Sequence, residues 1–302
     1  YKKKGYIMSR NESRLGLDNT PTQDDTPAAT TAAVGLGVPT SNTDAPNFSW
    51  SVPTEFVELP SQGIFYPAGH PLQNQKTVEI RYMTAKEEDI LTSRSLLKEG
   101  VALDRMLQNL LVSKNININT LLVGDKNALL VAARRTGYGA DYETNVTCPS
   151  CGNTDEHSFD ISNPSTVDFS SAADEHSISL NADGLVEISL PMTRAVVKCR
   201  FLTSADETSL IKESERKEKK KLDATATTDA IRAFVVSVNG QADPFSLESF
   251  IQSMPARDAR ELRRVYSELV PNIDLTQNYD CSNCGYDADL EVPLGLDFFW
   301  PK

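Results

Sequence analysis

The sequence has no long apolar run and no targeting segment of a recognisable kind. No stretch approaches the roughly 18 apolar residues that a membrane-spanning helix needs. The lysines at positions 2–4 are not followed by the apolar segment of a secretory signal. We therefore expect neither a membrane span nor secretion through a signal peptide.

Catalytic motifs are also missing. The sequence contains only three histidines, His70, His157 and His176. It shows no serine nucleophile elbow, no glycine-rich phosphate loop and no metalloprotease helix. The acidic run at 87–89 falls in the first turn of an expected helix, where negative charge complements the helix dipole. We predict that the protein is not an enzyme.

Basic residues are in the minority, with 30 Lys and Arg against 42 Asp and Glu and a net charge of −12. A protein that coats nucleic acid or an anionic membrane needs a basic surface, so both roles are disfavoured. The one basic cluster, at 212–221, is interleaved with glutamates. We interpret it as a solvated helix face, and contact with nucleic acid or an acidic partner stays the alternative.

Four of the five cysteines form two matching knuckles, Cys148-Pro149-Ser150-Cys151-Gly152 and Cys281-Ser282-Asn283-Cys284-Gly285. Each Cys-x-x-Cys pair supplies half of a tetrahedral zinc site. The glycine after each second cysteine suits the positive φ of such a turn. We predict one structural zinc ion bound by four thiolates, from Cys148, Cys151, Cys281 and Cys284. Such a site has no open coordination position for a substrate.

Other readings of the cysteines remain possible. Two separate redox pairs would each open a helix after a strand, whereas the residues around the first knuckle are typical of strand, knuckle and strand. His157 could replace one thiol ligand. Cys199 falls on the apolar face of an expected strand, and we predict a buried thiol without metal.

We expect an α+β fold with short β elements, helical groups and a split zinc ribbon. Residues 19–47 hold seven Thr, five Ala and four Pro but no aromatic residue, which is typical of disorder. We predict five regions: a disordered N-terminal arm (1–47), an N-terminal β/helical region (48–140), the first knuckle (141–163), an inserted β-hairpin with a helical region (164–278), and the second knuckle with an aromatic tail (279–302).

Local patterns predict individual elements of the first half. Residues 77–82 alternate as a strand does. Thr84 and Glu87 form a capping box before a helix, and the spacing of apolar residues at 103–111 predicts another amphipathic helix. Asp125 is expected to cap a further helix, which ends at the glycines of 137–139.

The second half is expected to begin with β structure at 164–203, including a hairpin. A second capping box begins at Ser204, and the apolar residues at 231–238 form a helical stripe. A helix after Pro255 should bury Leu262, Val265, Tyr266 and Leu269. The aromatic run Phe298-Phe299-Trp300 is either tucked into the core or exposed as an anchor for a partner.

Several of these segments together resemble a known family: residues 58–63, 65–67, 190–203 and 254–258, both knuckles, and the ending at 292–301. The combination is similar to the base-plate hub or hub-assembly proteins of T-even-type contractile-tailed bacteriophages, over about residues 56–301. The N-terminal arm lies outside the resemblance.

The resemblance implies a non-enzymatic structural or assembly subunit of a phage tail baseplate. It implies contacts with other baseplate and hub proteins, no small-molecule substrate, and a location in the virion or, during assembly, in the host bacterial cytoplasm. Both permanent residence in the virion and a role in assembly alone fit it. Two alternatives are a zinc-ribbon nucleic-acid-binding factor and a zinc-dependent hydrolase, which would need an open ligand position.

Overall fold

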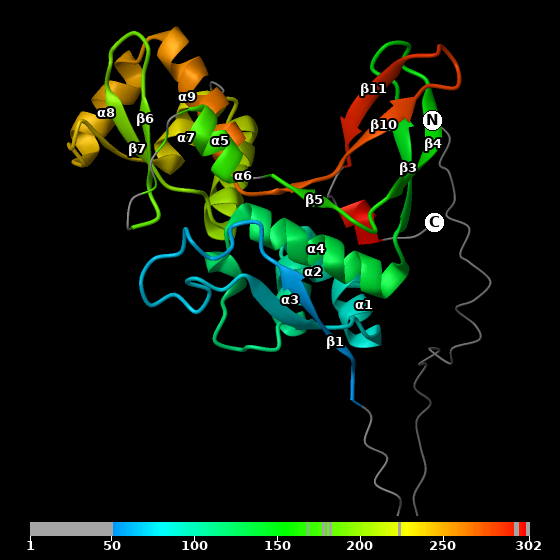
Figure 1. Cartoon of the computed structure of the whole chain (residues 1–302). Coiled ribbons are helices and arrows are strands. Elements are labelled where there is room, and N and C mark those ends of the chain that lie inside the picture. Colours follow the sequence, from blue (N-terminus) through cyan, green and yellow to red (C-terminus); the bar gives the residue numbers. More distant parts are fainter. Residues whose placement is uncertain are drawn as a thin grey trace, which may run out of the picture. The chain divides into compact units, whose positions relative to one another are not determined.

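The computed structural model describes residues 51–167, 169–176, 178, 180, 183–222, 225–292 and 296–299. The arm expected at 1–47 and the aromatic residue Trp300 lie outside the described residues. The described chain is α+β, as predicted, with helices placed among four two-stranded sheets and one three-stranded sheet, all antiparallel (Figure 1).

The first part of the chain is a two-stranded sheet followed by helices. Strand β1 pairs with β2, and the helices come next: β1 (Thr54–Glu58), β2 (Thr77–Arg81), α1 (Ala85–Thr92), α2 (Arg94–Glu99), α3 (Ala102–Leu110), the short 3-10 helix η2 (Ile118–Thr120) and α4 (Val123–Tyr138). The strand predicted at 77–82 and the helix predicted at 103–111 are confirmed to within one residue. The capping box before α1 is also confirmed, because the Thr84 amide donates to the Glu87 carboxylate at 3.1 Å.

Helix α4 starts differently from the prediction. Asp125 lies inside its first turn, and the cap position is taken by Leu122. The Asp125 carboxylate is buried and accepts hydrogen bonds from the Ser61 amide (3.0 Å), the Ser61 hydroxyl (2.6 Å) and the Tyr66 hydroxyl (2.7 Å). Burial raises the pKa of Asp125, although these bonds favour the carboxylate. The aspartate therefore anchors the loop after β1 to α4 and does not cap the helix.

The chain contains two similar hairpins. One directly follows α4, and the other is formed by the last two strands of the described chain. In the first, β3 (Asp141–Thr147) pairs with β4 (Thr154–Asp160). In the second, β10 (Thr276–Asp280) pairs with β11 (Asp287–Glu291). We call these four strands the metal hairpins. They lie side by side although more than a hundred residues separate them in the sequence (Figure 1).

The segment between the metal hairpins contains a sheet of order β6-β7-β8 and five helices among its described residues. Its elements are β5 (Ser165–Thr166), α5 (Phe169–Glu175), β6 (Val186–Ser189), β7 (Val196–Cys199), α6 (Ser204–Lys219), α7 (Ala226–Phe234), β8 (Val235–Val238), α8 (Pro244–Ser253), α9 (Ala256–Leu269) and β9 (Ile273–Asp274). The predicted hairpin is present as β6 and β7. The 3-10 helix η3 (Leu296–Phe299) ends the described chain.

Three predictions for this segment need correction. The β region expected at 164–203 contains helix α5. The helical stripe expected at 231–238 stops at Phe234, and the β-branched residues that follow form β8 against β7. The second capping box begins one residue earlier than predicted, at Thr203, whose amide donates to the Asp206 carboxylate at 2.9 Å.

The segment also closes on itself through its own backbone. Strand β5, which follows the first metal hairpin, pairs with β9, which precedes the second. The Val167 amide extends the contact by donating to the Asn272 carbonyl at 2.9 Å. The two ends of the inserted segment are therefore joined without the cysteines.

The core is one large apolar cluster that runs through the helices and the three-stranded sheet. Cys199 is buried in it, as predicted, and burial raises the pKa of its thiol to about 12. The predicted inner face of α9 is buried as well, at Leu262, Val265, Tyr266 and Leu269. None of the helices in the described ranges combines the length and the apolar character that crossing a bilayer requires.

Candidate metal centre

Each knuckle is a tight turn between two strands, and both turns have the same backbone hydrogen bonds. In the first, the Cys148 amide donates to the Asn153 carbonyl (2.8 Å) and the Gly152 amide to the Cys148 carbonyl (2.9 Å). In the second, the Cys281 amide donates to the Tyr286 carbonyl and the Gly285 amide to the Cys281 carbonyl, both at 2.9 Å. Each glycine is in the left-handed region, with φ of 72° and 67°, as the sequence predicted.

The four knuckle sulfurs converge on one point. The sulfurs of Cys148, Cys151, Cys281 and Cys284 all lie within 4.8 Å of one another. Two of the distances that cross between the knuckles, from Cys148 to Cys284 and from Cys151 to Cys281, are 3.8 Å. A disulfide has a sulfur–sulfur distance of about 2.05 Å, and all four cysteines are free. Sulfurs about 2.3 Å from a tetrahedral zinc ion would be about 3.8 Å apart, so the donor set fits such an ion.

Side chains outside the sulfurs also join the two hairpins. The Asp160 amide of β4 donates to the Gln277 side-chain oxygen of β10 at 3.0 Å, and the Gln277 side-chain nitrogen donates to the Asp160 carbonyl at 2.6 Å. The Gln277 amide thus imitates a strand partner at the edge of β4. At the other end, the Ser282 hydroxyl donates to the Asp155 carboxylate. The knuckles are therefore aligned at both ends of their contact.

The cluster is electrostatically suited to a cation. Backbone amides in the turn, foremost that of Cys284, lower the pKa of Cys281 to about 6. The Asn153 amide and the Asn283 side chain, which lies 3.6 Å from the Cys151 sulfur, lower the pKa of Cys151. The Tyr286 amide favours the Cys284 thiolate, but loss of hydration and the neighbouring sulfurs outweigh it and raise the pKa of Cys284 to about 12. Ionisation of all four sulfurs at this spacing would require a positive ion between them.

Burial differs between the two cysteines of each knuckle. Cys148 and Cys281 are buried and form a small cluster with Tyr279, whereas Cys151 and Cys284 are exposed. One side of the sulfur cluster is therefore open to solvent, through which an ion can enter.

The three histidines serve other contacts. The His157 ring packs edge-on against Phe159 and Tyr279, with centroid distances of 4.6 and 5.4 Å, so it supports the hairpins from beside the sulfurs. His70 stacks on Tyr66 at 4.3 Å, and burial lowers its pKa. His176 pairs with Glu268 between α5 and α9. The alternative in which His157 replaces a thiol ligand gains no support from this placement.

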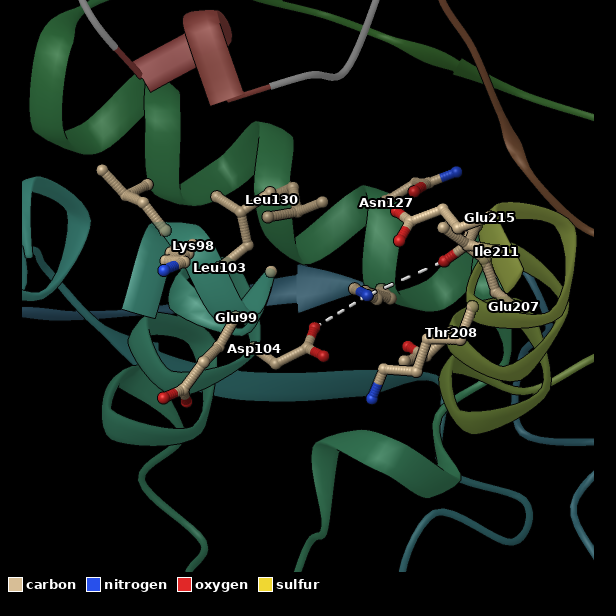
Figure 2. A pocket seen from close by; sticks show the side chains of 14 residues that line it. Lys98, Glu99, Leu103, Asp104, Asn127, Leu130, Glu207, Thr208, Ile211 and Glu215 are labelled. Carbon is tan, nitrogen blue, oxygen red and sulfur yellow. Dashed lines mark ion pairs between the residues drawn. The ribbon is translucent and has the colours of Figure 1, made fainter. Parts of the chain in front are cut away.

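A surface cavity of about 430 Å³ lies between α3, α4 and α6 (Figure 2). Lys126 is one of the lining residues, and its ammonium is 2.7 Å from the Asp104 carboxylate, 2.9 Å from the Ser204 hydroxyl and 3.7 Å from the Glu207 carboxylate. Lys126 is buried and already neutralised by these groups. The residue therefore joins helices α3, α4 and α6.

Sequence reasoning missed one buried side chain that fixes the end of the described chain. Arg134 of α4 donates from Nε to the Phe298 carbonyl (2.8 Å) and from its two terminal nitrogens to the Gly139 (2.8 Å) and Asp141 (3.1 Å) carbonyls. The side chain is only 2% exposed, and burial lowers its pKa. An arginine near a helix C-terminus is a common pattern, but nothing in the local sequence indicates a partner at residue 298.

Comparison with known proteins gives one match. A family model described as T4 bacteriophage base plate protein matches residues 64–300, which is most of the chain and includes all four knuckle cysteines. No curated protein and no solved structure matches the chain.

Proposed function

This chain belongs to the T4 bacteriophage base plate protein family, and we propose that it is a non-enzymatic structural or assembly subunit in the hub region of a contractile tail baseplate. The family match over residues 64–300 carries this proposal. Such a subunit works through contacts with other baseplate and hub proteins. It is located in the virion tail, or in the host cytoplasm while tails are assembled.

In this proposal, Cys148, Cys151, Cys281 and Cys284 bind one structural zinc ion. The 3.8 Å spacing between sulfurs of different knuckles supports a tetrahedral ion of zinc size. Four thiolates would complete its coordination, so the ion supplies no open position for hydrolysis. Its contribution is to fix the two metal hairpins against each other.

The contacts with partners are assigned to exposed apolar side chains. Phe245 at the start of α8 is 85% exposed and Phe56 on β1 is 70% exposed, which is unusual for phenylalanine. The expected aromatic anchor at the chain end is different, because Phe298 and Phe299 are each 1% exposed and pack in the core. Those two residues are therefore not assigned to docking, and Trp300 lies outside the described part of the chain.

Mass spectrometry of purified tails and of assembly intermediates tests the proposal. We expect the chain in at least one of these two fractions from cells that are making virions. Absence from both fractions would overturn the assignment to the baseplate.

A variant refines this test. Phe245→Ala should lower incorporation of the chain into tails while circular dichroism of the purified protein stays unchanged. Lys219→Ala, on the exposed face of α6, is the matched control and should incorporate normally. Equal incorporation of both variants would remove Phe245 from the docking surface and leave the family role intact.

A further inference from the structure

The hydroxyl of Tyr279 is a buried polar group in an unusual place. Tyr279 lies on β10, two residues before Cys281, and is 1% exposed. It forms one small cluster with the two buried cysteines, Cys148 and Cys281, and the edge of the His157 ring covers it. Its hydroxyl has no hydrogen-bond partner within the part of the chain that the structure describes. Buried hydroxyls without a partner are rare because they lose their bonds to water.

Two sulfurs, those of Cys148 and Cys281, lie in the same buried cluster as this side chain. A tyrosine hydroxyl, with an ordinary pKa of about 10, is protonated at neutral pH and acts as a donor. A neutral thiol is a weak acceptor, and no hydrogen bond of ordinary geometry forms with one here. A thiolate bound to a metal ion carries negative charge and accepts much more strongly.

We propose that the Tyr279 hydroxyl donates a hydrogen bond to the metal-bound thiolate of Cys281 and holds that ligand in position. The inference rests on the proposed zinc centre, because the acceptor that it names is the ionised sulfur of Cys281. Tyr279 is then a positioning residue, which acts on the metal through Cys281. Asn283 has a parallel role on the other knuckle, where its side-chain nitrogen lies 3.6 Å from the Cys151 sulfur. Groups that hydrogen-bond to metal ligands typically change metal affinity about 10–100-fold when they are removed.

Tyr279→Phe tests the proposal because it keeps the ring and removes only the hydroxyl. The full chain is loaded with cobalt(II), whose thiolate charge-transfer band reports electron density on sulfur. Loss of the hydrogen bond should move this band to longer wavelength and weaken zinc binding about 10-fold in competition with a chelator. Tyr286→Phe is the matched control, since Tyr286 packs against the same cluster and contributes its backbone carbonyl to the knuckle. The control should leave both readouts unchanged.

A second variant makes the test independent of removing a side-chain group. Fluorotyrosine at position 279 has a more acidic hydroxyl and is a stronger donor, so the cobalt band should move to shorter wavelength. Unchanged bands in both Tyr279 variants, with wild-type zinc affinity, would overturn the role of Tyr279. If the wild-type chain itself binds neither zinc nor cobalt through four thiolates, the proposed zinc centre fails, and that result is distinct from a failure of Tyr279.

Discussion

The metal hairpins and the helical body, by which we mean the rest of the described chain, are stabilised in different ways. The body contains a continuous apolar cluster with fully buried leucines such as Leu107, Leu129 and Leu262. The sulfur end of the hairpins has a separate cluster with only three buried side chains, Cys148, Tyr279 and Cys281. Apolar burial stabilises a protein roughly in proportion to area. The body therefore has a large core of its own, whereas the sulfur ends of the hairpins have little buried apolar area, which is why we assign the proposed ion a stabilising role there.

Buried polar groups also differ between the two regions. In the body, two buried aspartates, Asp125 and Asp258, have protein partners, and these partners come from the segments that carry the family resemblance. Residues 58–67 meet Asp125, and the turn after β6 meets Asp258, which accepts from the Met192 and Thr193 amides at 2.8 and 2.9 Å. Burial opposes ionisation of Asp258, but these bonds hold its pKa below the usual value. In the hairpins, the corresponding group is Tyr279, whose proposed partner appears only with the ion.

The largest effect should come from removing a metal ligand. Cys281→Ser is expected to abolish binding of the one zinc ion, because binding of a structural zinc contributes about 10 kcal/mol or more to the folded state. Hydrogen exchange should then show loss of protection at the sulfur ends of β3, β4, β10 and β11, whereas Tyr142 and Phe159 pack in the large core and should keep the other end of the first hairpin protected. Protection should persist in α4 and α9, because the body has its own core and because β5 and β9 close the inserted segment.

Cys199→Ser is the matched control for this comparison. It places a hydroxyl in the apolar core at a cost of about 1–3 kcal/mol, so the body should be destabilised while the zinc content stays at one ion per chain. Two zinc ions in the wild-type protein, or unchanged exchange in the hairpins of Cys281→Ser, would contradict a shared site.

The cluster of four cysteines was the part of the molecule most accessible from sequence. Its signal lies in short spacing, since a pair of cysteines and a glycine within five residues specifies the turn and the ligands together. The convergence of the pairs at 148–151 and 281–284 could be expected because each pair offers only half a tetrahedral site. Local patterns also located β2, α3 and the inner face of α9, where apolar periodicity is strong.

The second prediction tests the hydrogen bonds by which Arg134 joins the body to the end of the described chain. Arg134→Ala leaves the Phe298, Gly139 and Asp141 carbonyls without their donor and should lower the free energy of unfolding by about 3 kcal/mol. Hydrogen exchange at 296–299 should rise, and zinc content should not change. Arg135→Ala is the control, because Arg135 pairs with Glu55 at 3.2 Å and is partly exposed, so its loss should cost about 1 kcal/mol or less. Equal destabilisation by both variants would show that the three carbonyls are satisfied in another way.

Contacts of this kind could not be predicted from sequence, because the partners are far apart in the chain. Asp125 has the residue type and position of a helix cap, but the tertiary contact with Ser61 and Tyr66 determines its role. The cap of α6 was placed one residue late for a related reason. Both Thr203 and Ser204 can cap, and the pairing of Asp206 with Arg200 selects Thr203. The change from helix to strand at Val235 depends on β7, which local periodicity does not contain.

The smallest effect concerns acid stability of the body alone. The Arg200 guanidinium, 2.7 Å from the Asp206 carboxylate, together with the Thr203 cap, lowers the pKa of Asp206 to about 2. In the unfolded chain this pKa is about 3.9, so the unfolded state takes up the proton first as pH falls. The resulting stability is present above about pH 4 and is lost as pH falls toward 2. Because the pair is partly accessible to solvent, we expect about 1 kcal/mol.

Asp206→Asn should therefore destabilise the body at pH 7 by about 1 kcal/mol and reduce its further loss of stability between about pH 4 and 2. Urea unfolding in the Cys281→Ser background separates this effect from the hairpins, whose metal affinity falls with pH as the cysteines take up protons. Glu213→Gln is the control on the same helix, because Glu213 pairs with Arg216 in an exposed position and should have less effect. If the free energy of unfolding of Asp206→Asn falls with pH as steeply as that of its parent, the acid stability of the body depends on a carboxylate other than Asp206.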